Sequence, residues 1–173
     1  MARYYRYRKY SRRFRRKNWS SRITNLDITQ SVAGGQTFQV YRTLATNPAQ
    51  SEDSVSNKFT IKNIKCNFII EAGDNGQYLE NLQAFVLFVP QGFTFNASTP
   101  YEHPEWIMAS KHIGVALAAN NPGYSPLYMS TRLARKLDTG DRIVFVVQGV
   151  NTYQTQSASA RLTGIIRYNT KAN

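Results

Sequence analysis

The sequence predicts an all-β fold, an eight-stranded jelly-roll sandwich, preceded by a basic N-terminal arm. Short runs rich in Val, Ile, Phe, Tyr and Thr recur between Gly, Pro, Asn, Asp and Ser, and no long run has a helical period. Charge also divides the chain, because residues 1–22 hold 10 of the 22 Lys and Arg, whereas all 10 Asp and Glu follow. We therefore expect two parts, an arm over 1–22 and one jelly-roll domain over 23–173.

The arm has the composition of a segment that binds single-stranded nucleic acid. Ten like charges without an apolar period cannot offset the entropy of ordering, so the free arm is expected to be disordered and to become ordered only when bound internally. Arg supplies a planar fork for phosphate, and the interleaved aromatics offer faces on which unpaired bases stack. The predicted binding residues are Arg3, Tyr4, Tyr5, Arg6, Tyr7, Arg8, Lys9, Tyr10, Arg12, Arg13, Phe14, Arg15, Arg16, Lys17, Trp19 and Arg22.

Two other interpretations of the arm concern nuclear import and membrane binding. A nuclear import signal would use the same basic residues. An anionic membrane surface is the competing partner, but the aromatics fall on no single helical face. No apolar run follows the charges of the arm, as the core of a signal peptide would, and no later run approaches the length of a membrane span, so membrane insertion is not expected.

Eight strands follow the arm in order. They are expected near 23–31, 36–45, 57–72, 82–90, 106–117, 126–137, 141–150 and 159–168. Gly34 and Gly35 bend the connection between the first two. The connections at 46–56, 73–81, 91–105 and 118–125 are long for hairpins but suit Greek-key crossovers, which favours a jelly roll over an up-and-down barrel.

The third strand changes parity along its length. Phe59 and Ile61 share one face, but the next apolar residues, from Ile64 onward, fall on the other, so a β-bulge near Lys62 and Asn63 is predicted. With that bulge the polar face carries Lys58, Lys62, Lys65 and Glu71. These three lysines extend the phosphate-binding surface if the face points toward nucleic acid, and meet acids of a neighbouring subunit if it is an interface.

The run LQAFVLFVP at 82–90 is apolar on both faces and is therefore expected to be covered on both sides, at the centre of a sandwich or at a subunit contact. The stretch HPEWIMAS is expected to begin with a helical turn, since Pro104 suits a first helical position. Aromatics in or beside long connections are typical of interfaces. The predicted subunit-interface residues are Phe93, Phe95, Tyr101, Trp106, Tyr124 and Tyr128. Trp106 is the preferred anchor, and its alternative role is to fill the subunit's own core.

Residues for catalysis or cofactor binding are few. The chain has one Cys and two His, and no phosphate-binding glycine motif is present. Glu102, His103 and Glu105 have no closed zinc spacing and are expected to belong to a surface loop. We therefore predict neither a cofactor, nor a metal, nor an enzyme.

The string LDTG at 137–140, with GIIR at 164–167, is similar to the active-site loop of small dimeric aspartic proteases, in which Asp138 would be catalytic. Charged residues surround it on both sides, where such an active site is apolar. A hairpin turn between strands 126–137 and 141–150 is the preferred interpretation. The protease remains a minor alternative.

Four stretches together resemble capsid proteins of small circular single-stranded DNA viruses, the circovirus-like group that encodes a Rep protein. They are MARYYRYRKYSRRFRR, NKFTIKNIKCNFII, YEHPEWIMAS and STRLARKLDTGDRIVFVV. The resemblance implies an icosahedral shell of 60 copies, a packaged single-stranded genome with DNA favoured over RNA, assembly in the host nucleus and an unknown host receptor. A non-viral module that binds single strands through a basic tail is the main alternative.

Overall fold

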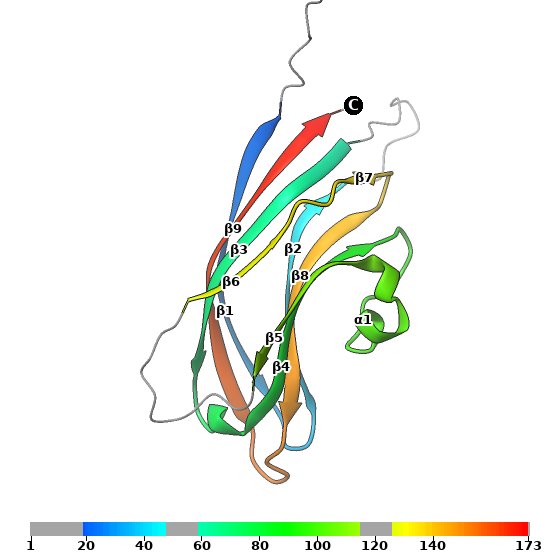
Figure 1. Ribbon diagram of the computed structural model, residues 1–173. Coiled ribbons are helices and arrows are strands. Elements are labelled where there is room, and N and C mark those ends of the chain that lie inside the picture. The colour runs from blue at the N-terminus through cyan, green and yellow to red at the C-terminus, as the bar shows by residue number, and fades with distance from the viewer. Residues whose placement is uncertain (1–18, 48–58, 115–125, 173) are drawn as a thin grey trace, which may run out of the picture.

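Two antiparallel β-sheets pack face to face in the computed structural model, which describes residues 19–47, 59–114 and 126–172 (Figure 1). This confirms the predicted all-β sandwich. The strands are β1 (Ser20–Val32), β2 (Thr37–Thr46), β3 (Phe59–Ala72), β4 (Leu79–Val89), β5 (Ile107–Gly114), β6 (Leu127–Thr131), β7 (Arg135–Leu137), β8 (Arg142–Asn151) and β9 (Ala158–Ala172). The helical pieces are η1 (Gly76–Tyr78), α1 (Thr99–Glu102) and η2 (Pro104–Trp106).

The strand order is that of a jelly roll. One sheet has the order β1-β9-β3-β6, with β7 also paired to β3, and the other has the order β2-β8-β4-β5. An up-and-down barrel pairs each strand with the next along the chain. Among the described strands only β4 and β5 are both consecutive and paired, so the barrel alternative is wrong.

The predicted bulge in β3 is present and keeps one face apolar. The pairing of β3 with β9 shifts between Lys62 and Lys65, and Asn63 has a positive φ of 53°. Ile61 and Ile64, one on each side of the shift, are both completely buried. The bulge therefore restores the inward parity that the sequence pattern loses at this point.

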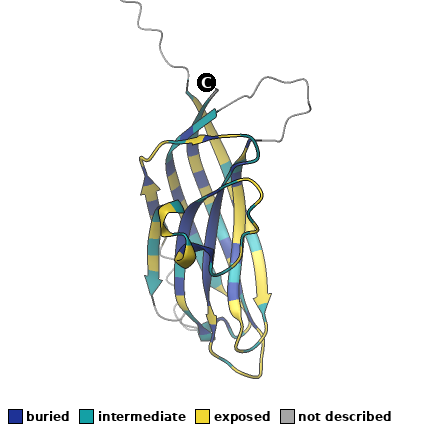
Figure 2. Cartoon of the chain, turned by 90° about the vertical axis from the view of Figure 1, so that its right-hand side faces the viewer, coloured by how far each residue is buried: buried dark blue, intermediate teal, exposed yellow. Residues whose placement is uncertain are grey.

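β4 is covered on both faces, as its sequence predicts. Its inward residues join the main core between the sheets, where Phe68 and Phe145 meet edge to face at 5.1 Å. Phe85 and Leu87 point to the other side and pack with Phe93 and other residues of the segment that includes α1 and η2. Figure 2 shows this segment in front of strands that are largely buried. The predicted helical turn at Pro104 is the 3-10 turn η2.

Two expectations for the segment 126–151 were wrong. The sixth strand is interrupted between β6 and β7, where the hydroxyl of Thr131 accepts a hydrogen bond from the backbone of Leu133. The predicted hairpin also does not form. A tight turn does join the runs, since the amide of Asp141 donates to Asp138, but β7 pairs with β3 whereas β8 pairs with β2 and β4. Turn residues specify a reversal of direction and not which strands pair.

Candidate nucleic-acid interface

Only part of the predicted binding set lies among the described residues. Trp19, Arg22, Lys62 and Lys65 are described, whereas the arm as far as Lys17, together with Lys58, lies outside. Lys62 and Lys65 both belong to β3 and flank the bulge. They define the face from which a site can be built.

The outer face of the β1-β9-β3-β6 sheet gathers cations from three strands. Strand register places residues that are directly opposite on the same face. Lys65 lies opposite Arg167 of β9, and Thr60 lies between Lys136 of β7 and Lys171 of β9. Lys62 lies opposite Asn169 on the same face. We call the five cations of this surface the basic face: Lys62, Lys65, Lys136, Arg167 and Lys171.

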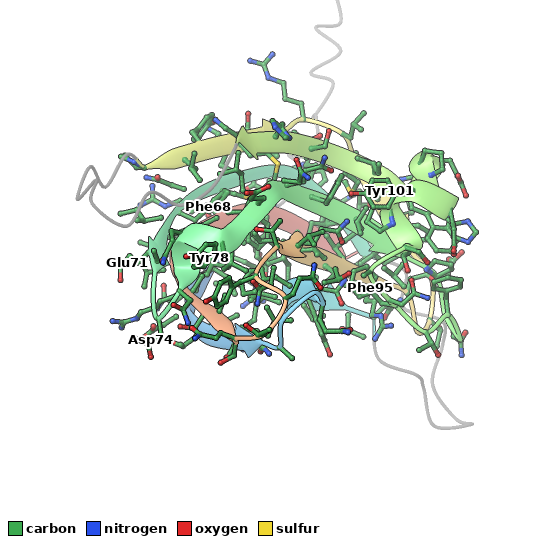
Figure 3. All side chains as sticks on the ribbon, turned by 90° about the horizontal axis from the view of Figure 1, so that it is seen from below. Phe68, Glu71, Asp74, Tyr78, Phe95 and Tyr101 are labelled. Atoms are coloured by element: carbon green, nitrogen blue, oxygen red, sulfur yellow. The ribbon has the colours of Figure 1, made fainter. Side chains whose placement is uncertain are left out.

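Two acidic residues on the strands of the same sheet, Glu71 and Asp27, lie at its other end, whereas Asp138 follows β7 at the basic end. Glu71 is opposite Arg161, and the carboxylate of Asp27 forms an ion pair with Arg161 at 3.0 Å. This hydrogen-bonded guanidinium holds the pKa of Asp27 below its ordinary value. Arg161 and Arg167 are six residues apart on β9, about 20 Å at the usual rise of a strand. Seen from below, Figure 3 shows Glu71 and Asp74 on one side of the molecule, away from Tyr101.

The cations of the basic face have no carboxylate partner among the ion pairs of the described residues. Lys65 and Arg167 are directly opposed like charges, an arrangement that destabilises a sheet. An anion lying across this face would remove that repulsion.

A groove of about 520 Å³ lies on this face. Lys65, Arg167 and Arg132 contribute positive charge to its lining, and Tyr128 and Ser130 lie beside them. The Tyr128 side chain is 53% exposed, so its ring is accessible to a stacked base. Charge for phosphate and an aromatic surface for a base thus lie within one groove.

The arm joins the body at the basic end. Trp19, the last aromatic of the arm, precedes β1, and the ammonium of Lys62 lies 3.9 Å from the centre of its indole ring. Figure 1 places the start of β1 beside the end of β9, near the start of β3. Arg22 does not share the side of the sheet that carries the basic face. It lies opposite the buried Tyr168, on the side of the sheet that faces the core, although Arg22 itself is exposed.

The sequence reasoning missed four members of this site, Arg132, Lys136, Arg167 and Lys171. A signal for two of them was available, because Arg167 and Lys171 occupy alternate positions of one strand and must share a face. Their approach to Lys65 could not be foreseen, since it depends on the pairing of β9 with β3, about a hundred residues apart.

The predicted interface aromatics do not form one surface. Trp106 stacks on His103 at 3.9 Å and meets Phe93 edge to face at 4.8 Å, so both belong to a cluster within the chain. Phe95 contacts Tyr41 at 5.8 Å. Tyr101 is 63% exposed and lies against β4, whereas Tyr128 belongs to the other sheet. Tyr124 lies outside the described residues. The subunit-contact role of these residues stays a prediction.

The residues considered for other chemistry have local partners. Glu102 accepts a hydrogen bond from Ser98, and His103 contacts Glu105 at 3.1 Å; no cluster of metal-ligating side chains occurs within the described ranges. Asp138 is exposed in its turn. Burial raises the pKa of the Cys66 thiol to about 12. No helix in the described part of the chain is long and apolar enough to span a membrane.

No family model and no curated protein matches this chain. Among solved structures, Desmodium yellow mottle tymovirus is 12% identical with a TM-score of 0.37, over 90% of this chain and 89% of that chain. Maize chlorotic mottle virus is 12% identical with a TM-score of 0.32, over 90% and 95%. A lipoprotein of Bacteroides thetaiotaomicron is 7% identical with a TM-score of 0.38, over 87% and 88%. Likenesses this weak support no conclusion about function.

Proposed function

We propose that this chain is a viral coat protein that assembles into a closed icosahedral shell of 60 copies and packages a single-stranded genome. The arm binds the nucleic acid, and the basic face continues the binding surface onto the body. DNA is favoured over RNA on the sequence resemblance alone. The same resemblance underlies a location in the virion, assembly in the host nucleus and import through the arm.

The observation that carries the proposal is the position of charge along the chain. Ten cations without an acid occupy residues 1–22, and this segment leads into the end of the jelly roll where the basic face lies. Cations that line a groove bind phosphate regardless of sequence, as packaging of a whole genome requires. If 60 copies form a shell, their net charge of +12 each gives about 720 positive charges, on the order of a thousand nucleotides.

The charge distribution of the body also keeps a second function open. A monomeric or dimeric module that binds single strands needs cationic surface on its folded domain, and the basic face supplies one. The two functions differ in assembly and not in ligand. A coat protein forms particles of uniform size, whereas a module stays small.

Particle size and nucleic-acid content test the proposal together. The full chain and a variant lacking residues 1–22 would be expressed, sized by light scattering and electron microscopy, and assayed for bound nucleic acid by absorbance. We expect uniform shells that contain nuclease-protected single strands, and loss of the nucleic acid in the truncated variant. A full chain that remains a small globule would contradict the coat function. Equal nucleic-acid content in both proteins would contradict the role of the arm.

A further inference from the structure

The outer face of the other sheet, β2-β8-β4-β5, has a different character. Gln39, Gln148 and Gln83 lie directly opposite one another across its strands β2, β8 and β4. The next row along the strands is Tyr41, Val146 and Phe85, where the covering segment with α1 and η2 begins. A row of amides therefore lies just beyond the edge of an apolar, covered region.

Two buried side-chain atoms of this row have no hydrogen-bond partner among the described residues. Gln148 is only 4% exposed, yet its Oε1 atom has no hydrogen-bond partner among the described residues, and the same is true of Nε2 of the neighbouring Gln39. Buried polar groups in native proteins are nearly always paired, so each exception needs an explanation. The terminal amide torsion of Gln is soft, so the amide of Gln148, which lines the pocket described next, can turn toward a bound molecule without a change of fold.

A pocket of about 340 Å³ lies over this row. Its polar lining comes from four separate parts of the chain and, among the described residues, includes none that is charged: Thr37, Asn81, Gln83, Ser98, Tyr101 and Gln148. The phenol of Tyr101 bonds Oε1 of Gln83 at 3.2 Å, which leaves the amide nitrogen of Gln83 as a donor. The Tyr101 ring packs edge to face on Phe85 and is 63% exposed at the pocket's side.

The backbone beside the pocket is irregular. The pairing of β4 with β8 shifts between Glu80 and Gln83, and Asn81 within that shift has a left-handed φ of 52°. Bulges redirect side chains and are frequent next to binding sites. Here the shift brings Asn81 into the pocket lining.

We propose that this pocket binds an uncharged sugar, a single pyranose unit of a glycan. A hydroxyl both donates and accepts, so neighbouring hydroxyls can donate to Gln148 Oε1 and accept from the amide nitrogen of Gln83, both of which line the pocket. The exposed Tyr101 ring offers a flat surface for the C–H face of the sugar. Among the described lining residues there is no cation to neutralise a phosphate, sulfate or carboxylate, which favours an uncharged ligand. An extended peptide cannot add here as a strand, because the floor is a paired part of the sheet whose backbone groups are already bonded.

Saturation-transfer NMR on the full chain tests the site and works on subunits and on particles. The probes are methyl α-D-glucopyranoside, methyl β-D-galactopyranoside and N-acetylglucosamine. We expect saturable binding of at least one sugar with a Kd in the millimolar range. Tyr101→Ala and Gln148→Leu should each weaken it about tenfold, the loss of about one good contact. The matched controls, Tyr41→Ala and Gln30→Leu, alter an exposed Tyr and Gln outside the pocket and should leave it unchanged.

Thermal unfolding of each variant separates lost binding from lost folding. Replacing an unpaired buried amide with Leu should leave the unfolding midpoint equal or higher, and Tyr101→Ala is an exposed change that leaves a folded protein. No saturable binding of any probe, or equal binding by Tyr101→Ala and the wild type, would overturn the proposal. Variants that alter particle yield while no sugar binds would also overturn it, in favour of a contact between copies. Nucleic-acid packaging plays no part in this assay, so either proposal can fail alone.

Discussion

Removing the opposed pair Lys65 and Arg167 should weaken nucleic-acid binding while leaving the protein equally or more stable. The double variant Lys65→Gln/Arg167→Gln loses two cations of the groove. Each phosphate contact with a single strand contributes about 0.7 to the slope of log K against log salt, so two contacts lower the slope by about 1.4. Between 50 and 200 mM salt, the affinity of the variant should therefore fall about sevenfold less than that of the wild type.

The stability of the same variant provides the second readout. Directly opposed like charges destabilise a sheet, and exposed charge pairs interact by about 0.2–1 kcal/mol, so their removal should raise the free energy of unfolding by up to roughly 1 kcal/mol. Most surface substitutions that abolish binding by damaging the fold would lower it instead. A combination of weaker binding and undiminished stability is thus specific to a functional cationic site.

Fluorescence anisotropy with a labelled oligothymidine measures the affinity at several salt concentrations, on subunits kept below the assembly concentration. Urea unfolding measures stability. The matched control is Arg42→Gln/Arg161→Gln, which removes the same charge from the other sheet and from the acidic end of this one. Equal salt slopes for the two double variants would refute the basic face as a binding surface. A lower free energy of unfolding for the first double variant than for the wild type would refute the repulsion.

Three further predictions follow from particular contacts. Gly164→Ala should destabilise the fold by about 1–3 kcal/mol, because a Cβ at this position would lie 2.4 Å from the carbonyl oxygen of Asn67; urea unfolding should show a clear drop in midpoint. Arg161→Gln should lower the unfolding midpoint slightly at pH 7, because it removes the ion pair that lowers the pKa of Asp27. A lowered pKa in the folded state stabilises the fold at pH values above the pKa of Asp27 in the unfolded chain. The difference in midpoint between the variant and the wild type should therefore vanish as the pH falls through the lowered pKa. Cys66, buried and with its pKa raised to about 12, should react with iodoacetamide at pH 8 only after unfolding, and rapid labelling of the native protein would contradict the buried core position.

Much of the fold could be predicted from the sequence, because alternation along a strand depends only on local residues. The eight expected strands overlap the observed ones, and the bulge follows from a change of parity that can be read between Ile61 and Ile64. The break between β6 and β7 could not be predicted in this way. It depends on a local turn at Thr131 within a run of residues that all tolerate extended backbone.

Pairing between distant strands was the part that the pattern could not supply. Turn residues at 138–141 suited a hairpin, yet Leu137 and Ile143 on either side are both completely buried in strands of opposite sheets. The strands before and after this turn can both be buried against one core whether they pair as a hairpin or lie in opposite sheets. The same limit hid the candidate site, since Lys65, Lys136 and Arg167 become neighbours only through the position of β3 between β9 and the β6–β7 edge.

The net charge of the body concealed the basic face for a related reason. Residues 23–173 carry 12 cations and 10 acids, which describes a nearly neutral domain. A sum over residues is insensitive to position, whereas phosphate binding depends on the local field of a few cations within about a Debye length of 10 Å. Strand register separates Lys65 and Arg167 from the acids Asp27 and Glu71 along one sheet, so a neutral domain presents a cationic end. Such a distribution suits a subunit that must bind a polyanion at one place and approach identical copies elsewhere without strong repulsion.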